Sequence, residues 1–335
     1  MIDNCENLFY TYLDECKKNF LTDCMKENGD TFEEYSITSF TFNKKSYQEV
    51  FEKEWTKLRS KYNMDSEKAM HFVEYKKLIK AEERGPQNKE YTKFVVDGEF
   101  SEDKLKEFFK DLRKLLLKSE FFIVHTDFYW NKQSFLAKRP KYNKVQLTNP
   151  SRNVADSLLN AVPYVAMRKH LDSLMISLLK NESDGNYYLD EMLPRKINTK
   201  LRFDADGKQF DARTDLKRAY NHTITVGSDN VNEKISSEIL DEIRFIRKDE
   251  VGSAFTPNHC GLEVVDMFCS MLAGETRFKE YQNIDAFSEE FEYKAGDFIN
   301  LKFSDGEVIE FESIIKDKIR YETINYGSLS TVVGR

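Results

Sequence analysis

Four acidic residues in this 335-residue chain lie within short apolar runs or at their ends: Asp14, Glu74, Asp204 and Asp266. Hard divalent cations prefer oxygen ligands, so convergent carboxylates are typical of Mg²⁺ or Mn²⁺ sites. Two such ions can activate water and stabilise the leaving oxygen of a phosphodiester. The residue types therefore suggest metal-dependent hydrolysis, provided that the fold brings these acids to one cleft.

The first acid follows the aromatic and apolar residues 8–13. Such a run predicts a buried strand, and ligands of open α/β sheets bind outside the strand ends. Successive strand side chains point to opposite faces, so Asp14 and Glu15 would not serve the same ion, and we favour Asp14. The simpler alternative is that these two acids only mark the point where a strand becomes polar and turns.

The segment 261–273 predicts a helix that is apolar on most of its circumference, with a polar stripe of Glu263, Asp266, Ser270 and Gly274. Such a helix is buried, so the stripe should face a closed cleft. Two carboxylates three residues apart are costly there unless a metal ion or a basic side chain compensates them. The alternative to a metal site is a salt-bridged buried helix.

The remaining patterns predict an α/β protein. Strands are expected at 35–42, 120–128, 200–204 and 243–246, and helices around 50–58, 101–116 and 165–179. Asp127, at the end of the second of these strands, is a spare candidate carboxylate. The Asp-Gly turn at 305–306 predicts a hairpin over 298–311. We therefore expect a main domain over 1–278 and a small C-terminal β-containing appendage over 279–335.

Net charge gives the chain no general attraction to nucleic acid or to an anionic membrane, because the formal charge is -7. The segment 128–155 is the exception, since it contains no acid and interleaves aromatic residues with basic ones. Basic side chains neutralise phosphates and aromatic rings stack on bases. The predicted contacts to RNA or DNA are Lys132, Lys138, Arg139, Lys141 and Lys144. The alternative is a solvated basic loop whose aromatic residues pack inward.

The cysteines and the N-terminus bear on location. Five cysteines with no CxxC pair predict reduced thiols, with neither a disulfide framework nor a zinc site. The first residues lack a signal-peptide pattern, and no apolar run approaches 18 residues. We therefore expect a cytoplasmic protein without a membrane partner.

Four short motifs, in this order, resemble the bacterial family known as domain of unknown function 3800. They are Tyr12-Leu13-Asp14-Glu15, Glu74-Tyr75-Lys76, Phe203-Asp204 and Gly261-Leu262-Glu263-Val264-Val265-Asp266, and the resemblance spans about residues 8–275. It implies a ribonuclease-H-like mixed β-sheet flanked by helices. It also implies that Asp14, Asp204 and Asp266 hold divalent metal and that Glu74 completes the set.

The chain departs from the family pattern at two places. Cys16 stands where the family has Ser and no Gly follows it, which affects the opening turn. Glu263 replaces a Gln and adds negative charge beside Asp266. This change either strengthens metal binding, which makes Glu263 a further predicted metal ligand, or indicates drift from the family. The resulting expectation is a metal-dependent nuclease or related phosphodiesterase, with defence against foreign nucleic acid as one setting. The alternative is a non-catalytic relative that binds nucleic acid or a protein.

Overall fold

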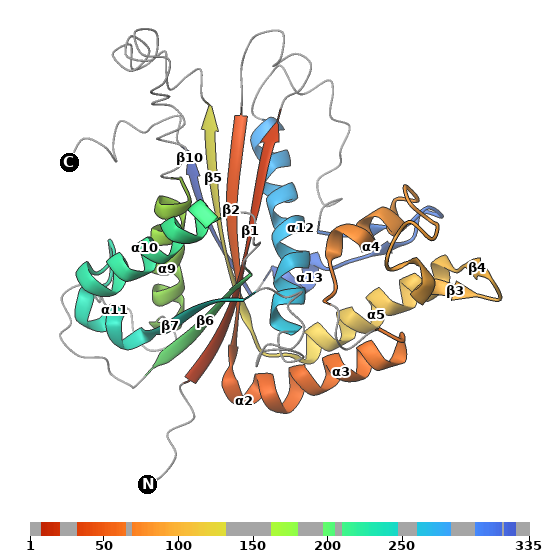
Figure 1. Ribbon diagram of the computed structural model, residues 1–335, viewed down its shortest axis with the longest axis horizontal. Helices are drawn as coiled ribbons and strands as arrows, with labels where there is room; N and C mark the ends of the chain where they lie inside the picture. The colour runs from red at the N-terminus through yellow and green to blue at the C-terminus, as the bar shows by residue number, and fades with distance from the viewer. Residues whose placement is uncertain are drawn as a thin grey trace.

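The computed structural model describes residues 8–20, 32–64, 69–131, 162–179, 197–204, 210–246, 260–282, 299–316 and 318–325. These residues form one six-stranded sheet with helices on both faces and two small hairpins (Figure 1). The mixed α/β architecture predicted from the sequence is therefore confirmed.

The large sheet has the strand order β10-β5-β2-β1-β6-β7. Its strands are β1 (Leu8–Phe20), β2 (Phe32–Asn43), β5 (Phe122–Asn131), β6 (Asn198–Asp204), β7 (Leu240–Ile246) and β10 (Ile319–Asn325). Strands β1, β2 and β5 pair antiparallel in succession, whereas β6 runs parallel to β1 and β7 runs parallel to β6. Strand β10 runs parallel to β5 at the opposite edge.

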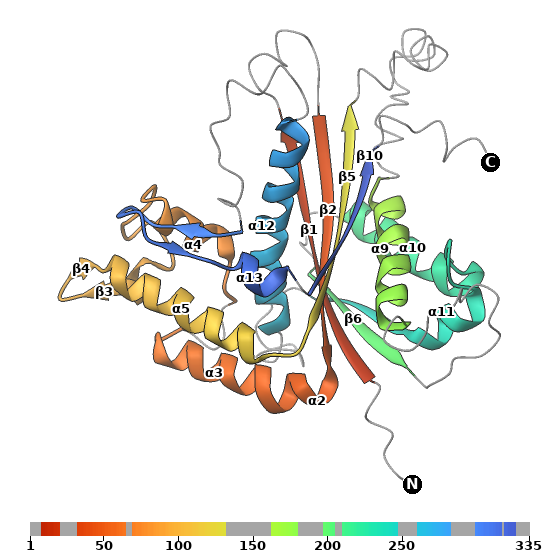
Figure 2. The same ribbon diagram turned by 180° about the vertical axis from the view of Figure 1, so that it is seen from behind.

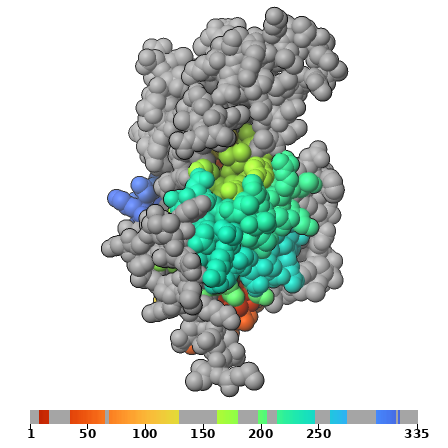
Figure 3. Space-filling model, turned by 90° about the vertical axis from the view of Figure 1, so that its left-hand side faces the viewer, coloured from red at the N-terminus to blue at the C-terminus, as the bar shows by residue number. Residues whose placement is uncertain are grey.

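Helices cover both faces of the sheet (Figures 1 and 2). One face, called here the α12 face, lies against α12 (Cys260–Gln282) and the helices grouped around it: α2 (Lys44–Ser46), α3 (Glu52–Lys61), α4 (Phe72–Ile79), α5 (Glu102–Lys118) and α13 (Glu312–Ile315). The other, called the α9 face, is covered by α9 (Val162–Leu179), α10 (Phe210–Val226) and α11 (Glu233–Ile239). Figure 3 shows that α10 and α11, in green to teal, form part of the outer surface on the α9 side.

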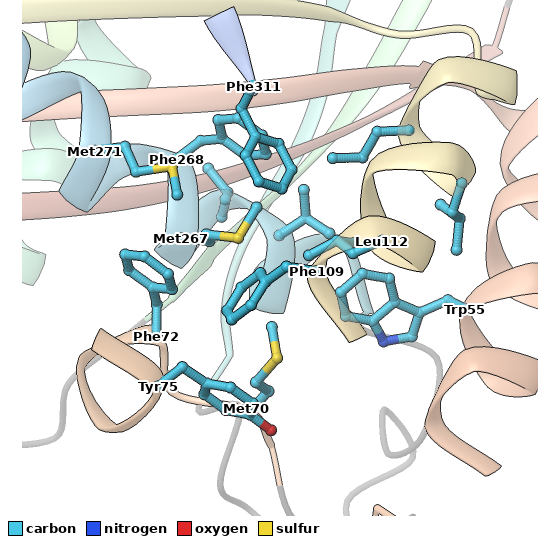
Figure 4. Close-up of a cluster of buried hydrophobic side chains, with 14 of the residues drawn as sticks. Trp55, Met70, Phe72, Tyr75, Phe109, Leu112, Met267, Phe268, Met271 and Phe311 are labelled. Atoms are coloured by element: carbon cyan, nitrogen blue, oxygen red, sulfur yellow. The ribbon is translucent and has the colours of Figure 1, made fainter. Parts of the chain in front are cut away.

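The period-two alternation of the strands divides the apolar side chains between two cores. On β1, Tyr12 belongs to the core under α12, whereas Leu13 belongs to the core under α9. The core on the α12 side is rich in rings and methionines contributed by α12, α3, α4 and α5. Figure 4 shows part of it, with labels on Trp55, Met70, Phe72, Tyr75, Phe109, Leu112, Met267, Phe268, Met271 and Phe311.

The first strand is longer than its apolar run suggests. We predicted that it stops at Asp14-Glu15, but β1 continues to Phe20 because β2 pairs with it as far as the Phe20–Phe32 register. The antiparallel ladder satisfies the backbone groups of the polar residues there, so an apolar run is not needed. Asp14 nevertheless lies where the parallel part of the sheet ends, since β6 stops at Asp204.

Several predicted helices are confirmed with small changes of boundary. Helix α5 begins after Ser101, whose side chain accepts a hydrogen bond from the Lys104 amide at 3.2 Å, as its N-cap pattern predicted. Helix α9 extends the predicted helix at 165–179 by one turn at its start. Residues 72–79, for which no helix was predicted, form α4.

The C-terminal segment is integrated with the rest of the fold. Strands β8 (Leu301–Lys302) and β9 (Val308–Ile309) form the predicted hairpin, in which Gly306 adopts a φ of 87°. Within the small C-terminal appendage predicted over 279–335, Phe311 is fully buried in the core under α12 and β10 extends the main sheet. Apolar residues after the hairpin bury more surface on the sheet than they could within a two-stranded ribbon. A further hairpin, β3 (Val95–Val96) and β4 (Glu99–Phe100), precedes α5.

Candidate functional site

Asp14 and Asp204 come together through the register of β1 and β6. The last pair of this parallel ladder is Leu13 with Phe203, and both side chains belong to the core on the α9 face. The next residue on each strand therefore points to the α12 face. Neighbouring strands lie about 4.8 Å apart, so the register brings Asp14 and Asp204 to adjacent positions of β1 and β6 on this face.

The two acids that follow Leu13 point to opposite faces, as predicted. Asp14 is nearly buried, and its Oδ1 accepts a hydrogen bond from the Glu15 amide at 2.8 Å. Glu15 accepts a hydrogen bond from the Tyr35 hydroxyl, and Tyr35 packs in the core on the α9 face. Burial raises the pKa of Tyr35, and the Glu15 carboxylate raises it further. Glu15 is thereby assigned to a different environment from Asp14.

Asp266 projects from the polar stripe of α12. Along residues 260–273 of this helix every side chain is buried except those of Asp266 and Ser270, which are partly exposed, so these two members of the predicted stripe differ from Glu263, which is buried. Asp266 Oδ2 accepts a hydrogen bond of 3.0 Å from the amide of Phe72, the first residue of α4. The positive end of a helix dipole stabilises a carboxylate in this position. Helix α4 therefore fixes the orientation of Asp266.

Glu74 lies in the first turn of the same helix, two residues after Phe72. Its Oε1 lies 3.5 Å from Lys77 Nζ, and its side chain is 21% exposed. Because the start of α4 contacts Asp266, Glu74 is held at the same end of α4 as that carboxylate. The ion pair with Lys77 is partly exposed and therefore contributes little to stability. The partial exposure also leaves the Glu74 carboxylate accessible to solvent.

Glu263 has a structural environment. Its Oε2 accepts a 2.6 Å hydrogen bond from Trp55 Nε1, while its Oε1 accepts from the Met70 amide at 2.6 Å and from the Arg59 guanidinium. Its side chain is 6% exposed, and that of Arg59 is 14% exposed. These contacts favour the salt-bridged helix over the metal-ligand prediction for Glu263, since three donors already compensate the carboxylate.

Cys269 connects Asp14 with α12 and was not singled out by the sequence. Its thiol donates to the carbonyl oxygen of Asp14 across 3.6 Å. Burial raises the pKa of Cys269, and the negative charges of Asp14 and Asp266 are among the further causes. One thiol therefore lies within electrostatic reach of both acids. The available signal was spacing, because Cys269 follows Asp266 by three residues on one helical face.

Asp127 lies within β5, which continues to Asn131, and not at a strand end as predicted. Its carboxylate is 1% exposed and accepts a hydrogen bond from the Ser36 hydroxyl. Its Oδ2 lies 2.9 Å from His125 Nε2. Such burial against β2 and β5 separates Asp127 from solvent, so it is not grouped with the three acids above.

The donors at this site suit a hard divalent cation, because all are carboxylate oxygens and two of the three acids are partly exposed. Among the residues that the structure describes, no three His, Cys, Asp or Glu side chains are already positioned to hold a metal ion. The basic residues predicted to contact nucleic acid, Lys132, Lys138, Arg139, Lys141 and Lys144, lie outside the described residues. No helix in the described ranges is long and apolar enough to cross a membrane.

Comparisons with known proteins give no assignment. No protein-family model matches the chain, and no curated protein or solved structure matches it significantly. The resemblance to the domain of unknown function 3800 family thus stays a prediction, and the site is interpreted from its own residues.

Proposed function

We propose that this protein is a divalent-metal-dependent phosphodiesterase that cleaves nucleic acid, built on a ribonuclease-H-like fold. The proposed metal ligands are Asp14, Asp204 and Asp266, and the proposed metal is Mg²⁺ or Mn²⁺. The observation that carries the proposal is the register that sets Asp14 beside Asp204 on the face covered by α12, the helix that bears Asp266.

The order of the strands supports the fold part of the proposal. Three antiparallel strands, β1, β2 and β5, are followed by β6 and β7 parallel to β1, so that β1 is central and two acids meet at the end of its parallel pairing. Ligand sites of α/β sheets are found at such strand ends.

The residues around the acids have distinct parts in this proposal. When bound, a divalent ion supplies an activated water and stabilises the leaving oxygen of the phosphodiester. The Phe72 amide holds the Asp266 carboxylate, and the Cys269 thiol holds the main chain at Asp14. Glu74 completes the acidic set from the start of α4, whereas Glu263 ties α12 to α3 through Trp55 and Arg59.

A second candidate is a non-catalytic protein that keeps the fold and binds nucleic acid or a protein partner. The engagement of Glu263 by three donors favours it, because one acid of the polar stripe then has a purely structural explanation. The two candidates differ in their requirement for metal.

A cleavage assay separates them. The parent, Asp14→Asn and Asp204→Asn proteins would be incubated with labelled single-stranded RNA, single-stranded DNA and an RNA–DNA hybrid in Mn²⁺ and in EDTA. We expect metal-dependent cleavage of at least one substrate by the parent and its loss in both variants. Asp229→Asn is the matched control, since Asp229 is a half-exposed acid that pairs with Lys169 of α9 on the opposite side of the sheet. Binding of all three substrates without Mn²⁺-dependent cleavage would favour the second candidate.

A further inference from the structure

A chain of buried polar side chains lies beside Asp14 on the α12 face. The strand registers place Asp14, Thr38 and His125 in one row across β1, β2 and β5. Cys16, Ser36 and Asp127 form the next row. Directly opposed residues of antiparallel strands have Cβ atoms about 4.5 to 5.5 Å apart, so Thr38 is the immediate neighbour of Asp14 on this face.

The side chains of these two rows are connected. Thr38 Oγ1 lies 2.7 Å from His125 Nδ1, and His125 Nε2 lies 2.9 Å from Asp127 Oδ2. Ser36 donates its hydroxyl proton to Asp127 Oδ1. The four side chains of Ser36, Thr38, His125 and Asp127 are at most 1% exposed, so the chain is closed to solvent.

The other end of the chain reaches the proposed site. The Thr38 hydroxyl also hydrogen-bonds the Cys269 thiol. Cys269 in turn donates to the main-chain oxygen of Asp14. Thr38 thus links His125 and Asp127 of β5 to Cys269 of α12 and, through Cys269, to the strand that carries Asp14.

Burying these polar side chains is costly, all the more because the contact between His125 Nε2 and Asp127 Oδ2 lacks hydrogen-bond geometry, and apolar side chains would fill the same space without that cost. The α9 face contains a matched pair for comparison, because Thr126 Oγ1 lies 3.0 Å from His170 Nδ1 and both residues are fully buried. The contacts of that pair lead to none of the three proposed ligands. Among the contacts of the described residues, the two Thr–His pairs therefore differ in that Thr38–His125 is connected to Asp14, whereas Thr126–His170 is not.

From these contacts we infer that Thr38, anchored by His125 and Asp127, is a positioning residue that holds Asp14 against α12 and thereby sets the affinity of the acidic site for divalent cations. The inference rests on the proposed metal site. Hydrogen-bonded partners behind metal ligands typically contribute a factor of about 10 to 100 in metal affinity.

The test compares Thr38→Val with Thr126→Val. Valine has nearly the size of threonine and lacks the hydroxyl, so each variant deletes one buried hydroxyl from a Thr–His pair. The dissociation constant for Mn²⁺ would be measured by titration calorimetry on the full-length proteins, alongside thermal melts in EDTA. We expect Thr38→Val to raise the Mn²⁺ dissociation constant by about 10- to 100-fold. Thr126→Val should leave the Mn²⁺ dissociation constant unchanged. It should lower the melting midpoint in EDTA by about as much as Thr38→Val does.

Two further variants complete the test. Thr38→Ser keeps the hydroxyl and should restore the parent affinity for Mn²⁺. Asp127→Asn acts at the far end of the chain and should weaken Mn²⁺ binding about tenfold or more, which provides a readout if Thr38→Val does not fold.

The outcomes separate this inference from the proposed function. A parent that binds Mn²⁺ together with unchanged affinity in Thr38→Val or Asp127→Asn overturns the positioning role alone. Equal weakening by Thr126→Val also overturns it, because the effect would then reflect general destabilisation. A parent protein that does not bind Mn²⁺ overturns both the metal site and the role of Thr38.

Discussion

The two acids of the α12 stripe should respond in opposite ways when their charges are removed. Asp266 accepts one backbone hydrogen bond from Phe72 and is partly exposed, whereas Glu263 is buried against Arg59. Asp266→Asn keeps an oxygen acceptor and weakens a helix-terminus interaction worth about 0.3 to 1 kcal/mol, offset by less repulsion with Asp14. Glu263→Gln removes the charge that pairs with the Arg59 guanidinium in a largely buried setting, at a cost of about 3 to 5 kcal/mol.

Thermal melts can distinguish these magnitudes. Unfolding entropies of about 2.1 cal/mol/K per residue give roughly 0.7 kcal/mol/K for a chain of 335 residues. In EDTA, Glu263→Gln should therefore melt about 4 to 7 °C below the parent, and Asp266→Asn within about 1.5 °C of it. In Mg²⁺ at 100 times its dissociation constant the parent should gain about 2.7 kcal/mol, or roughly 4 °C, and Asp266→Asn should lose that gain.

Two results would contradict the role proposed for Asp266. An Asp266→Asn protein that melts as far below the parent as Glu263→Gln does in EDTA would show that Asp266 is a structural ion-pair partner. Retention of the full Mg²⁺ stabilisation by Asp266→Asn would remove Asp266 from the ligand set. Melts of Ser270→Ala, on the same stripe of α12, control for any change in helix packing.

Three other outcomes are expected. Gly261→Ala should lower stability by about 1 to 3 kcal/mol, measured by urea unfolding, because an added Cβ would lie 2.2 Å from Tyr12 Cδ2 and push α12 away from β1; a parent-like unfolding midpoint would contradict this close packing. Replacement of Lys138, Arg139 and Lys141 by Glu should weaken binding of a labelled oligonucleotide and flatten its salt dependence, since fewer counterions are released. An unchanged salt slope would favour the alternative that this segment is a solvated loop. Burial lowers the pKa of His170 from its usual 6.5 to about 3. The unfolded chain therefore binds a proton at this residue before the folded chain does. The stability that the neutral, buried His170 contributes is present above pH 6.5 and is lost as the pH falls toward 3. In acid titrations of stability between pH 6 and 4, His170→Gln should remove up to about 1.4 kcal/mol of that loss per pH unit, whereas the exposed His222→Gln should remove little; equal slopes in the parent and His170→Gln proteins would contradict the assignment.

Much of the fold follows from local patterns in the sequence. The apolar and aromatic run at 8–13 predicts a central strand, and the nearly continuous apolar circumference of 261–273 predicts a buried helix. The structure has a central strand and a buried helix there, because an element that is covered on all sides needs apolar side chains on all of them. The Asp-Gly hairpin near the C-terminus is likewise a local signal that needs no tertiary context.

Features that depend on distant pairing could not be predicted in this way. The extension of β1 to Phe20 depends on a ladder with β2, and the addition of β10 to the sheet depends on a strand nearly 200 residues earlier. The candidate site shows the same limit. The sequence indicated which acids could act, but Trp55 and Arg59 of another helix decide the environment of Glu263.

The polar chain behind Asp14 is the clearest example. Thr38, His125 and Cys269 come from β2, β5 and α12, and only the strand register and the packing of α12 bring them together. In the sequence, Thr38 and His125 are ordinary strand residues with no motif around them, and Cys269 is marked only by its spacing from Asp266. Their proximity is a property of the sheet, so a single sequence carries no signal for it.

The central claim is that Asp14, Asp204 and Asp266 share a divalent cation, and anomalous diffraction from crystals soaked in Mn²⁺ tests it most directly. We predict anomalous density bounded by these three carboxylates, with Mn²⁺–oxygen distances of about 2.0 to 2.6 Å. Ordered carboxylates lying more than about 10 Å apart, with no anomalous density between them, would contradict the claim, because no single ion could then bind all three.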